Sequence, residues 1–403
     1  MSFFSPQASG IIKVMPIFGT RPEAIKMAPV IRILAADARF RVVTVVTAQH
    51  REMLDQVLAI FDLTPAYDLD LMQPGQSLTA ITCRVLAGLE EVIRAEQPDL
   101  VLVHGDTTTT FAAGLAAFYQ RLPVGHVEAG LRTGDPYQPF PEEMNRRLAG
   151  ALTALHFAPT LRAAANLRQE GVPEERIFIT GNTVVDALLT CAASLAQRGI
   201  VAPRTVGIAG PYLLATIHRR ENWGERLAGM WRALGRLLDE FTAYELVMPV
   251  HLNPLVQETV RRILGGRPRV HLLPPVDYEE MVLLMQGAHL ILTDSGGIQE
   301  EAPALGKPVV VLRNTTERPE ALAAGTVLLA GTKEEEIYAA GRRLLGDAEL
   351  YNRMAKAVNP YGDGRAAVRI REAILYAFGF SPSRPAPFGL KGDEKASQAT
   401  FPS

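Results

Sequence analysis

The sequence predicts an α/β fold made of two doubly wound domains, each with a parallel sheet. About a dozen short apolar segments alternate with segments of helical periodicity along the 403 residues. The apolar segments are continuous, as expected for strands that helices cover on both faces of a sheet. About six of them fall in each half of the chain, and two sheets of that size are commoner than one sheet twice as large.

The expected strands follow one another at regular intervals. In the first half of the chain they lie at 11–19, 41–48, 99–106, 122–130, 154–160 and 175–182. In the second half they lie at 211–219, 245–253, 269–275, 289–297, 307–314 and 325–331. The segments between them are long enough for the helical crossovers that connect parallel strands.

We expect the first domain over 11–182 and the second over 183–364, with residues 1–10 as an N-terminal extension. The segment 193–210 gathers glycine and proline and loses helical periodicity, which suits a linker near this boundary. The tail, 381–403, is rich in proline, serine and charged residues, and it is predicted to be disordered.

Charge and cysteine content exclude several classes of protein. The 41 basic and 43 acidic side chains give a net charge of −2, which offers no basic surface for nucleic acid or for an anionic membrane. Cys83 and Cys191 are too few for a disulfide framework, and no spacing of histidine and cysteine suggests zinc. No apolar run approaches the ~20 residues of a membrane span. We therefore expect a cytoplasmic protein without a metal site.

Polar residues gather where the predicted strands end. In open parallel sheets, ligands bind beyond the carboxyl ends of the strands. These ends carry Gly19, Thr20, Arg21, Gln49, His50, His104, Asp106, Glu128, His218, Arg219, His251, Asp294 and Arg313. Each residue alone is better explained by a helix cap or a surface loop. Taken together they predict a ligand site, which we expect in a cleft between the two domains.

The segment DSGGIQEE is typical of a phosphate-binding turn. Ser295, Gly296 and Gly297 open a predicted helix, whose free N–H groups and dipole favour an anion. Glu300 and Glu301 either complement that dipole or supply a carboxylate for a ribose hydroxyl pair. The segment is neither a Walker loop nor GxGxxG, which counts against a nicotinamide cofactor.

A second glycine turn, FGTRPEAIKMAP, places Arg21 and Lys26 near a helix start. A cation there opposes the helix dipole, so these residues are expected to have a function. Arg21 could reach a diphosphate directly, whereas Lys26 could reach it or pair with a carboxylate.

Three carboxylates in the first half, Asp106, Glu128 and Glu142, are candidates for general acid and base. Asp106 could instead cap the next helix, but the threonines Thr107 to Thr110 can supply that cap themselves. Glu142 could form a plain salt bridge with Arg146, four residues further along a predicted helix.

Among the eight histidines, His218 is the best candidate for chemistry. It ends a predicted strand and two arginines follow it, so it could lie against phosphate oxygens.

Eight motifs in chain order closely resemble the bacterial non-hydrolysing UDP-N-acetylglucosamine 2-epimerases over residues 11–378. They are FGTRPEAIKMAP, TAQHREMLDQV, VHGDTTTT, HVEAGLRTGD, PFPEEMNRR, HRREN, DSGGIQEEAPALGKP and NTTERPEA. The resemblance implies a GT-B architecture, a homodimer and no cofactor, with a last helix at 365–378 that returns to the first domain. It also implies the reversible conversion of UDP-N-acetylglucosamine into UDP-N-acetylmannosamine, by elimination of UDP to a 2-acetamidoglucal and its re-addition.

The same resemblance assigns roles to individual residues. Those implied in catalysis are Lys26, Asp106, Glu128, Glu142 and His218. Those implied in substrate binding are Arg21, Arg146, Ser295, Gly296, Gly297, Glu301 and Arg318. UDP-N-acetylglucosamine is also implied as an activator, bound by Gln49, His50, Arg84, Arg219 and His251. Which carboxylate is acid and which is base stays open, as does the polysaccharide pathway served.

Three alternatives share parts of this pattern. A GT-B glycosyltransferase would have the same fold and donor site, and fold alone does not separate the two. The carboxylate motifs VEAGLRTGD and PEEMNRR favour the epimerase. A hydrolysing relative would release free N-acetylmannosamine. A nucleotide-sugar sensor would have lost the acid and base groups, and the sequence retains all of them.

Overall fold

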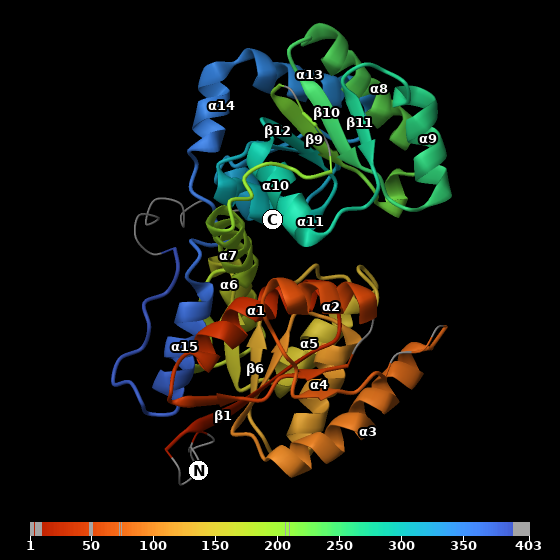
Figure 1. Ribbon diagram of the computed structural model, residues 1–403. Helices are drawn as coiled ribbons and strands as arrows, with labels where there is room; N and C mark the ends of the chain where they lie inside the picture. The colour runs from red at the N-terminus through yellow and green to blue at the C-terminus, as the bar shows by residue number, and fades with distance from the viewer. Residues whose placement is uncertain are drawn as a thin grey trace. The chain divides into compact units, whose positions relative to one another are not determined.

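The computed structural model describes residues 4, 10–47, 51–71, 73, 75–205, 207–208 and 210–389. The chain divides into two compact units (Figure 1). Unit 1 comprises the residues up to Ala187 together with those from Tyr361, and unit 2 comprises Leu188–Pro360. The chain therefore passes between the units twice, once within helix α7 (Thr183–Gln197) and once at Pro360.

Unit 1 contains an eight-stranded sheet of order β4-β3-β1-β5-β6-β7-β8, in which β2 also pairs with β1 and every pairing is parallel. The strands are β1 (Ile12–Phe18), β2 (Phe40–Val42), β3 (Val45–Val46), β4 (Tyr67–Asp68), β5 (Leu100–His104), β6 (Val124–Val127), β7 (Leu155–Ala158) and β8 (Ile177–Ile179). The two-residue strand β4 was not expected, because it is too short to give an apolar run. The register places His104 beside Val127, so the turns after β5 and β6 are neighbours.

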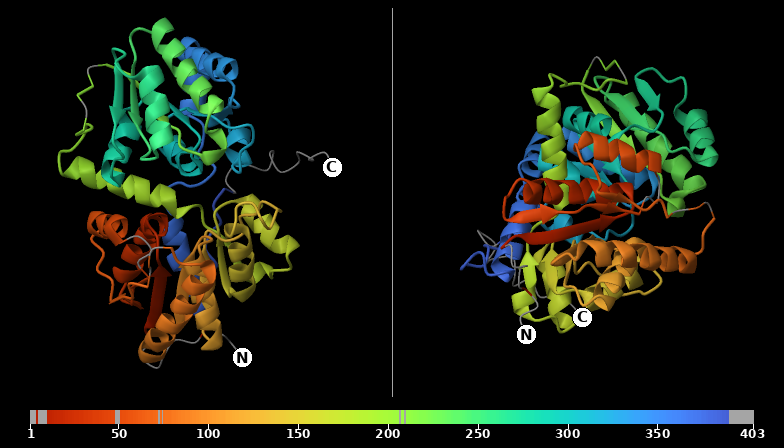
Figure 2. Two further views of the ribbon diagram at one scale, coloured as in Figure 1. Left: turned by 90° about the vertical axis from the view of Figure 1, so that its right-hand side faces the viewer. Right: turned by 60° about the horizontal axis from the view of Figure 1, so that its bottom comes forward.

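The helices of unit 1 cover both faces of this sheet (Figure 2). They are α1 (Arg21–Ala35), α2 (Arg51–Ile60), α3 (Leu78–Glu96), α4 (Thr108–Tyr119), α5 (Glu142–Leu152), α6 (Leu161–Gln169), the 3-10 helix η1 (Glu174–Arg176), the start of α7, and α15 (Ala366–Ala377). Apolar side chains of α3 and α4 form one core with β1 and β5, which includes Ile17, Leu89 and Val103. Helix α15 packs beside α1 although the two are far apart in the sequence (Figure 1).

Unit 2 contains a six-stranded parallel sheet of order β11-β10-β9-β12-β13-β14. The strands are β9 (Tyr212–Thr216), β10 (Glu245–Pro249), β11 (Val270–Leu273), β12 (Leu290–Thr293), β13 (Val309–Val311) and β14 (Val327–Leu329). Its helices are η2 (Arg220–Asn222), α8 (Glu225–Glu240), α9 (Pro254–Leu264), α10 (Tyr278–Gly287), α11 (Gly296–Glu301), η3 (Ala302–Leu305), α12 (Pro319–Ala323), α13 (Glu334–Gly346) and α14 (Ala348–Ala355). The fully buried Trp231 packs in the core of this unit.

Both sheets carry their polar turns at the carboxyl ends of central strands. In unit 1 the strands before β5 lie on one side of the pair β1 and β5, and the strands after it lie on the other side. In unit 2 the pair β9 and β12 divides the sheet in the same way. Crevices at such reversal points are where open parallel sheets bind ligands. The predicted α/β class with two parallel sheets is confirmed.

Two local predictions are wrong. Residues 381–389, expected to be disordered, lie against the edge strand β8. The N–H of Phe388 donates to the carbonyl of Ile179 at 2.9 Å, and the Arg384 guanidinium donates to backbone carbonyls near that strand. Amino-acid composition alone does not indicate that Arg384 and Phe388 contact the open edge of a sheet. Residues 390–403 of the predicted tail lie outside the described residues.

The second wrong prediction concerns only the start of the expected linker. Residues 193–197 form the end of α7, because alanine, leucine and glutamine are good helix formers. The described residues of 198–210 belong to no helix or strand. Among the described residues we find no helix with the length and hydrophobicity that a membrane-spanning segment requires. The cytoplasmic location stays a prediction.

Candidate functional site

Glu128 is a tightly held carboxylate at the polar edge of unit 1. It follows β6 with a backbone φ of 66°, a left-handed conformation that costs a non-glycine residue about 1–3 kcal/mol. Its carboxylate forms an ion pair with the ammonium group of Lys26, and the Asn182 Nδ2 atom donates to Glu128 Oε2 at 2.8 Å. Only 9% of the Glu128 side chain is exposed. These contacts hold a residue with a strained backbone in position, and such strain is common at functional sites.

Asp106 lies in the neighbouring turn, after β5. The guanidinium of Arg146 donates to Asp106 Oδ2 at 2.6 Å, and the side-chain amide of Asn145 donates to the Asp106 carbonyl. Burial raises the pKa of Asp106, although the cation of Arg146 opposes this shift. Thr107 caps helix α4, as predicted, by accepting from the N–H of Thr110, so Asp106 does not cap that helix.

Glu142 begins helix α5 at the same edge of unit 1. The alternative salt bridge between Glu142 and Arg146 does not form among the described residues, since Arg146 contacts Asp106 and Glu143 instead. The buried Oε2 atom of Glu142 accepts no hydrogen bond from the described part of the chain. A buried carboxylate oxygen without a donor is costly, which suits a group that receives one from a ligand.

Glu23 was missed in the sequence. Its carboxylate is buried and accepts from the N–H groups of Gly19 and Thr20, at 3.1 and 2.8 Å, and from the hydroxyls of Thr107 and Thr110, at 2.6 and 3.1 Å. It therefore fixes the turn before α1 to the turn after β5. The spacing T-x-x-E predicts the helix cap, but nothing in the sequence indicates the two threonines of the other turn.

Helix α1 also carries two predicted residues. Arg21 is its first residue and Lys26 lies five residues further on. Of the two possibilities left open for Lys26, pairing with a carboxylate is the one observed.

Asp294 organises the polar edge of unit 2. This fully buried carboxylate accepts from the backbone N–H groups of His218 and Arg219 and from the Asn222 side-chain amide, at 2.9–3.2 Å. The ring of His218 stacks on that of His251, with 6.0 Å between ring centroids. Burial lowers the pKa of His218, against the opposing effect of Asp294, so the imidazole is neutral at neutral pH.

Two arginines flank the glycine turn of the same unit. A Cβ atom built on Gly296 would lie 3.6 Å from Arg318 Nη2 and 3.8 Å from Arg219 Nη2. The buried carboxylate of Glu300 accepts from Arg318 Nε at 2.5 Å and so orients that guanidinium. Ser295 precedes the first turn of α11. Two guanidinium groups and a helix start therefore converge on one point, which is an arrangement that favours an anion.

The remaining predicted residues are placed as follows. Gly297 and Glu301 lie in α11. Arg84 lies on α3, where its guanidinium donates to the side chain of Gln73 at 2.8 Å and to a backbone carbonyl. Gln49 and His50 lie outside the described residues.

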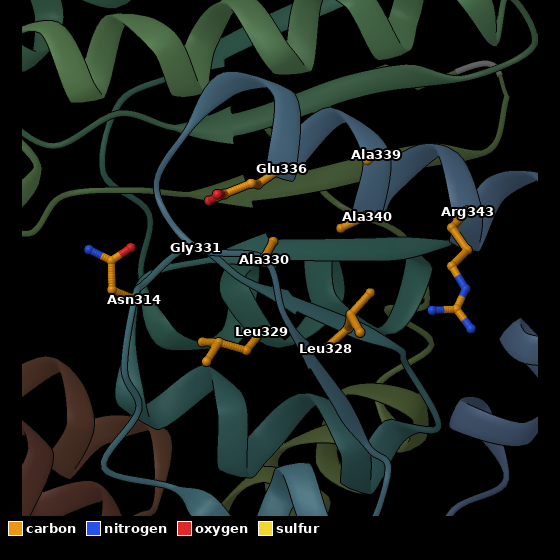
Figure 3. A pocket seen from close by; sticks show the side chains of 9 residues that line it. All are labelled: Asn314, Leu328, Leu329, Ala330, Gly331, Glu336, Ala339, Ala340 and Arg343. Carbon is orange, nitrogen blue, oxygen red and sulfur yellow. The ribbon is translucent and has the colours of Figure 1, made fainter.

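A pocket of about 560 Å³ lies elsewhere in unit 2, between β14 and α13 (Figure 3). Its lining consists of Asn314, Leu328, Leu329, Ala330, Gly331, Glu336, Ala339, Ala340 and Arg343. None of the predicted site residues belongs to this lining, and Glu336 and Arg343 lie at opposite ends of it. Because its charged groups do not converge, we do not assign the candidate site to this pocket.

Comparison with known proteins decides the family. Residues 32–375 match the family model described as UDP-N-acetylglucosamine 2-epimerase. A Salmonella typhimurium protein of that name is 54% identical over 373 residues, which cover 90% of this chain and 98% of the relative. The chain belongs to the UDP-N-acetylglucosamine 2-epimerase family. The family identified from the motifs is confirmed, and this is a family of isomerases.

Solved structures of the family agree with the fold. A Listeria monocytogenes crystal structure has a TM-score of 0.86 and 49% identity, covering 94% of this chain and 99% of that one. The Neisseria meningitidis UDP-GlcNAc 2-epimerase, solved with bound UDP-GlcNAc, has a TM-score of 0.83 and 48% identity, covering 91% of this chain and all of that one. The GT-B-like class predicted for this chain is confirmed.

Proposed function

We propose that this protein interconverts UDP-N-acetylglucosamine and UDP-N-acetylmannosamine. The observation that carries the proposal is the group of carboxylates in unit 1, where Asp106 and Glu128 each contact a cation. Membership of the epimerase family supports it, as does the UDP-GlcNAc bound by the Neisseria relative.

The chemistry explains why such groups are needed. The C2 hydrogen of the sugar is not next to a carbonyl, so direct removal is too costly. Loss of UDP from C1 creates oxocarbenium character, which acidifies C2 and permits elimination to a 2-acetamidoglucal. UDP then adds back while a proton is delivered to the opposite face of C2. Such a route requires cations for the departing UDP and an acid or base for each face.

We assign the nucleotide to the residues of unit 2 that converge on Gly296. In this proposal Arg318 and the N–H groups around Ser295 and Gly297 hold the diphosphate, and Glu301 accepts the ribose hydroxyls. The ion pair between Arg318 and Glu300 supports the first assignment, because it orients the guanidinium before any ligand binds.

We assign proton transfer to Asp106, Glu128 and Glu142, with His218 as a further candidate. The raised pKa of Asp106 suits a group that must carry a proton at neutral pH. The ion pair with Lys26 supports a role for Glu128 as the base. Arg21 and Arg146 are proposed for the diphosphate, although the contact between Arg146 and Asp106 also supports a role in holding that carboxylate.

Incubation with UDP-N-acetylglucosamine in deuterium oxide, followed by NMR, tests the function. We expect UDP-N-acetylmannosamine, with deuterium at C2 of both epimers. The Glu128→Gln protein serves as the control for contaminating activity. Conversion that retains the C2 protium would overturn the elimination route. Free N-acetylmannosamine as the main product would identify the hydrolysing alternative, and sugar transfer to an acceptor would identify a glycosyltransferase.

We further propose that UDP-N-acetylglucosamine activates the enzyme at a second site, formed by Gln49, His50, Arg84, Arg219 and His251. A ligand that binds one conformation more tightly shifts the population towards it. We expect sigmoidal dependence on this substrate, and little conversion of pure UDP-N-acetylmannosamine until some of the other epimer is added. A hyperbolic curve with prompt reverse reaction would exclude the activator site.

A homodimer is also proposed, and large exposed apolar side chains support it. Phe118 and Tyr119 end helix α4 and are 57% and 67% exposed, and the adjacent helix α5 exposes Met144 and Leu148. Sedimentation of the protein at micromolar concentration should give twice the 43.9 kDa chain mass.

We propose that the product serves the synthesis of a mannosamine-containing surface polysaccharide.

A further inference from the structure

Asn182 uses every polar atom of its side chain at the edge of unit 1. Its Nδ2 atom donates to Glu128 Oε2 at 2.8 Å, and its Oδ1 atom accepts from the N–H of Val184 at 3.0 Å. Its own backbone N–H donates to the carbonyl of Tyr361 at 2.6 Å. Only 2% of the residue is exposed, so its amide cannot turn without breaking these contacts.

The orientation of Glu128 depends on such contacts. Its left-handed backbone stands outside both the strand before it and any helix, so neither secondary structure fixes the direction of the side chain. Lys26 reaches the carboxylate from a long, flexible stem, which supplies charge but little directional constraint. The amide of Asn182 is short and held at both ends, and it supplies the direction.

We propose that Asn182 is a positioning residue, which holds the Glu128 carboxylate in the orientation required for proton transfer at C2. The inference rests on the proposed function, because it assigns Glu128 to that step. Position 182 then requires an uncharged side chain that donates a hydrogen bond to Glu128. Aspartate has the same shape as asparagine but lacks the N–H groups.

The charged and titratable groups around Glu128 come from several elements. Lys26 on α1 contacts it, and His104 at the end of β5 lies 3.8 Å from it, between Nε2 and Oε2. Asp106 and His126 interact with it electrostatically. Burial lowers the pKa values of His104 and His126, to about 3 and about 4, so near neutral pH neither imidazole adds a positive charge beside this carboxylate.

Steady-state kinetics test the inference through the separation of kcat from binding. For Asn182→Ala and Asn182→Asp we expect kcat to fall by roughly 10–100-fold, the range seen when a partner that orients a reactive group is lost. The dissociation constant of UDP should stay within about twofold, since none of the partners described for Asn182, which are Glu128, Val184 and Tyr361, is assigned to UDP. Asn166→Ala is the matched control, because it removes an amide that donates to the Gly130 carbonyl at 2.9 Å and, within the described part of the chain, to no carboxylate. A fall in kcat no larger than that of the control would overturn the proposal.

A second test needs no activity. In Asn182→Asp the two carboxyl groups face each other, which raises the pKa of one of them in the folded state. Because that pKa is raised, the variant loses stability as pH increases, so its Tm deficit against wild type should be larger at pH 8 than at pH 5. Adding Glu128→Gln should abolish this difference, since the new amide can donate to the introduced aspartate.

The two tests separate the inference from the proposed function. Wild-type protein that epimerises UDP-N-acetylglucosamine, combined with a pH-independent Tm deficit in Asn182→Asp, overturns only the role of Asn182. Wild-type protein without epimerase activity overturns the proposed step at C2. The coupling between the two side chains would then still be supported by a pH-dependent deficit that Glu128→Gln removes.

Discussion

The polar edges of the two units are built on the same kind of parallel sheet, yet the ion pairs at these edges serve opposite purposes. In unit 1 the carboxylates of Asp106 and Glu128 are paired with cations, Arg146 and Lys26. In unit 2 the cation of Arg318 is oriented by the carboxylate of Glu300. The side chains assigned to the chemistry in these pairs are therefore anions in unit 1 and a cation in unit 2.

The comparison teaches that the sheet determines only where a site lies. Both edges arise at the reversal point of a parallel sheet, but whether that edge suits proton transfer or anion binding depends on a few buried ion pairs. Four predictions test this difference between the two units, from the largest expected effect to the smallest.

The largest effect should come from the carboxylates of unit 1. Replacing a general acid or base typically costs 10²–10⁴-fold in rate, and we expect turnover to fall by about that factor in Asp106→Asn, Glu128→Gln and Glu142→Gln. UDP should bind Glu128→Gln and Glu142→Gln with nearly wild-type affinity, measured by calorimetry. His218→Asn tests whether unit 2 also contributes to this chemistry. Near-normal turnover in any variant would remove that residue from the catalytic group.

A second prediction concerns the acid sensitivity of unit 1. Burial lowers the pKa values of His104, His126 and His156, on neighbouring strands of unit 1, to about 3, 4 and 3. An unfolded histidine binds a proton below about pH 6.5. Because the folded pKa values are depressed, stability is present above pH 6.5 and is lost as pH falls towards them. At pH 5 each histidine should cost about 2 kcal/mol.

Thermal unfolding at pH 7 and pH 5 measures this loss. His156→Leu should reduce the drop in Tm between the two pH values, because one titrating group is removed. Phe157→Leu, at the next buried position of β7, should lower Tm equally at both values. Equal pH dependence in wild type and His156→Leu would show that this histidine is not held neutral.

A third prediction concerns the anion site of unit 2. Arg318→Lys keeps the charge but loses the forked contact with a phosphate. The lost charge-assisted hydrogen bond is worth roughly 1.5–3 kcal/mol, so UDP should bind about 10–100-fold more weakly. Turnover at saturating substrate should fall much less than in the carboxylate variants. An unchanged dissociation constant for UDP would exclude this arginine from the nucleotide site.

The smallest effect is expected for Glu301→Ala. Its proposed contact is with the ribose, away from the reacting carbon, so we expect weaker nucleotide binding with little change in turnover. Comparison of UDP with 2′-deoxy-UDP provides the control, since the variant should no longer distinguish them. If the variant still distinguishes the two nucleotides, its carboxylate does not bind the ribose.

The strands and the polar turns could be predicted because each depends on residues adjacent in sequence. The turn after β12 is an example, where aspartate, serine and two glycines follow an apolar run. Partnerships between turns could not be predicted in the same way. Nothing local indicates that Glu23 accepts from Thr107, that Arg146 prefers Asp106 to Glu142, or that Asn182 reaches Glu128. These contacts depend on the order of strands in the sheet, which a single sequence does not specify.

The discontinuity of unit 1 has a consequence for synthesis of the chain. Helix α1 emerges from the ribosome first, but its packing partner α15 emerges only after all of unit 2. The buried carboxylate of Asp186 likewise accepts hydrogen bonds from the N–H groups of Ala366 and Ala367, which are translated after unit 2. Unit 2 can therefore complete its fold before unit 1 does, although most of unit 1 is translated earlier. A premature stop just before residue 361 would consequently leave the later unit intact and the earlier one unfinished.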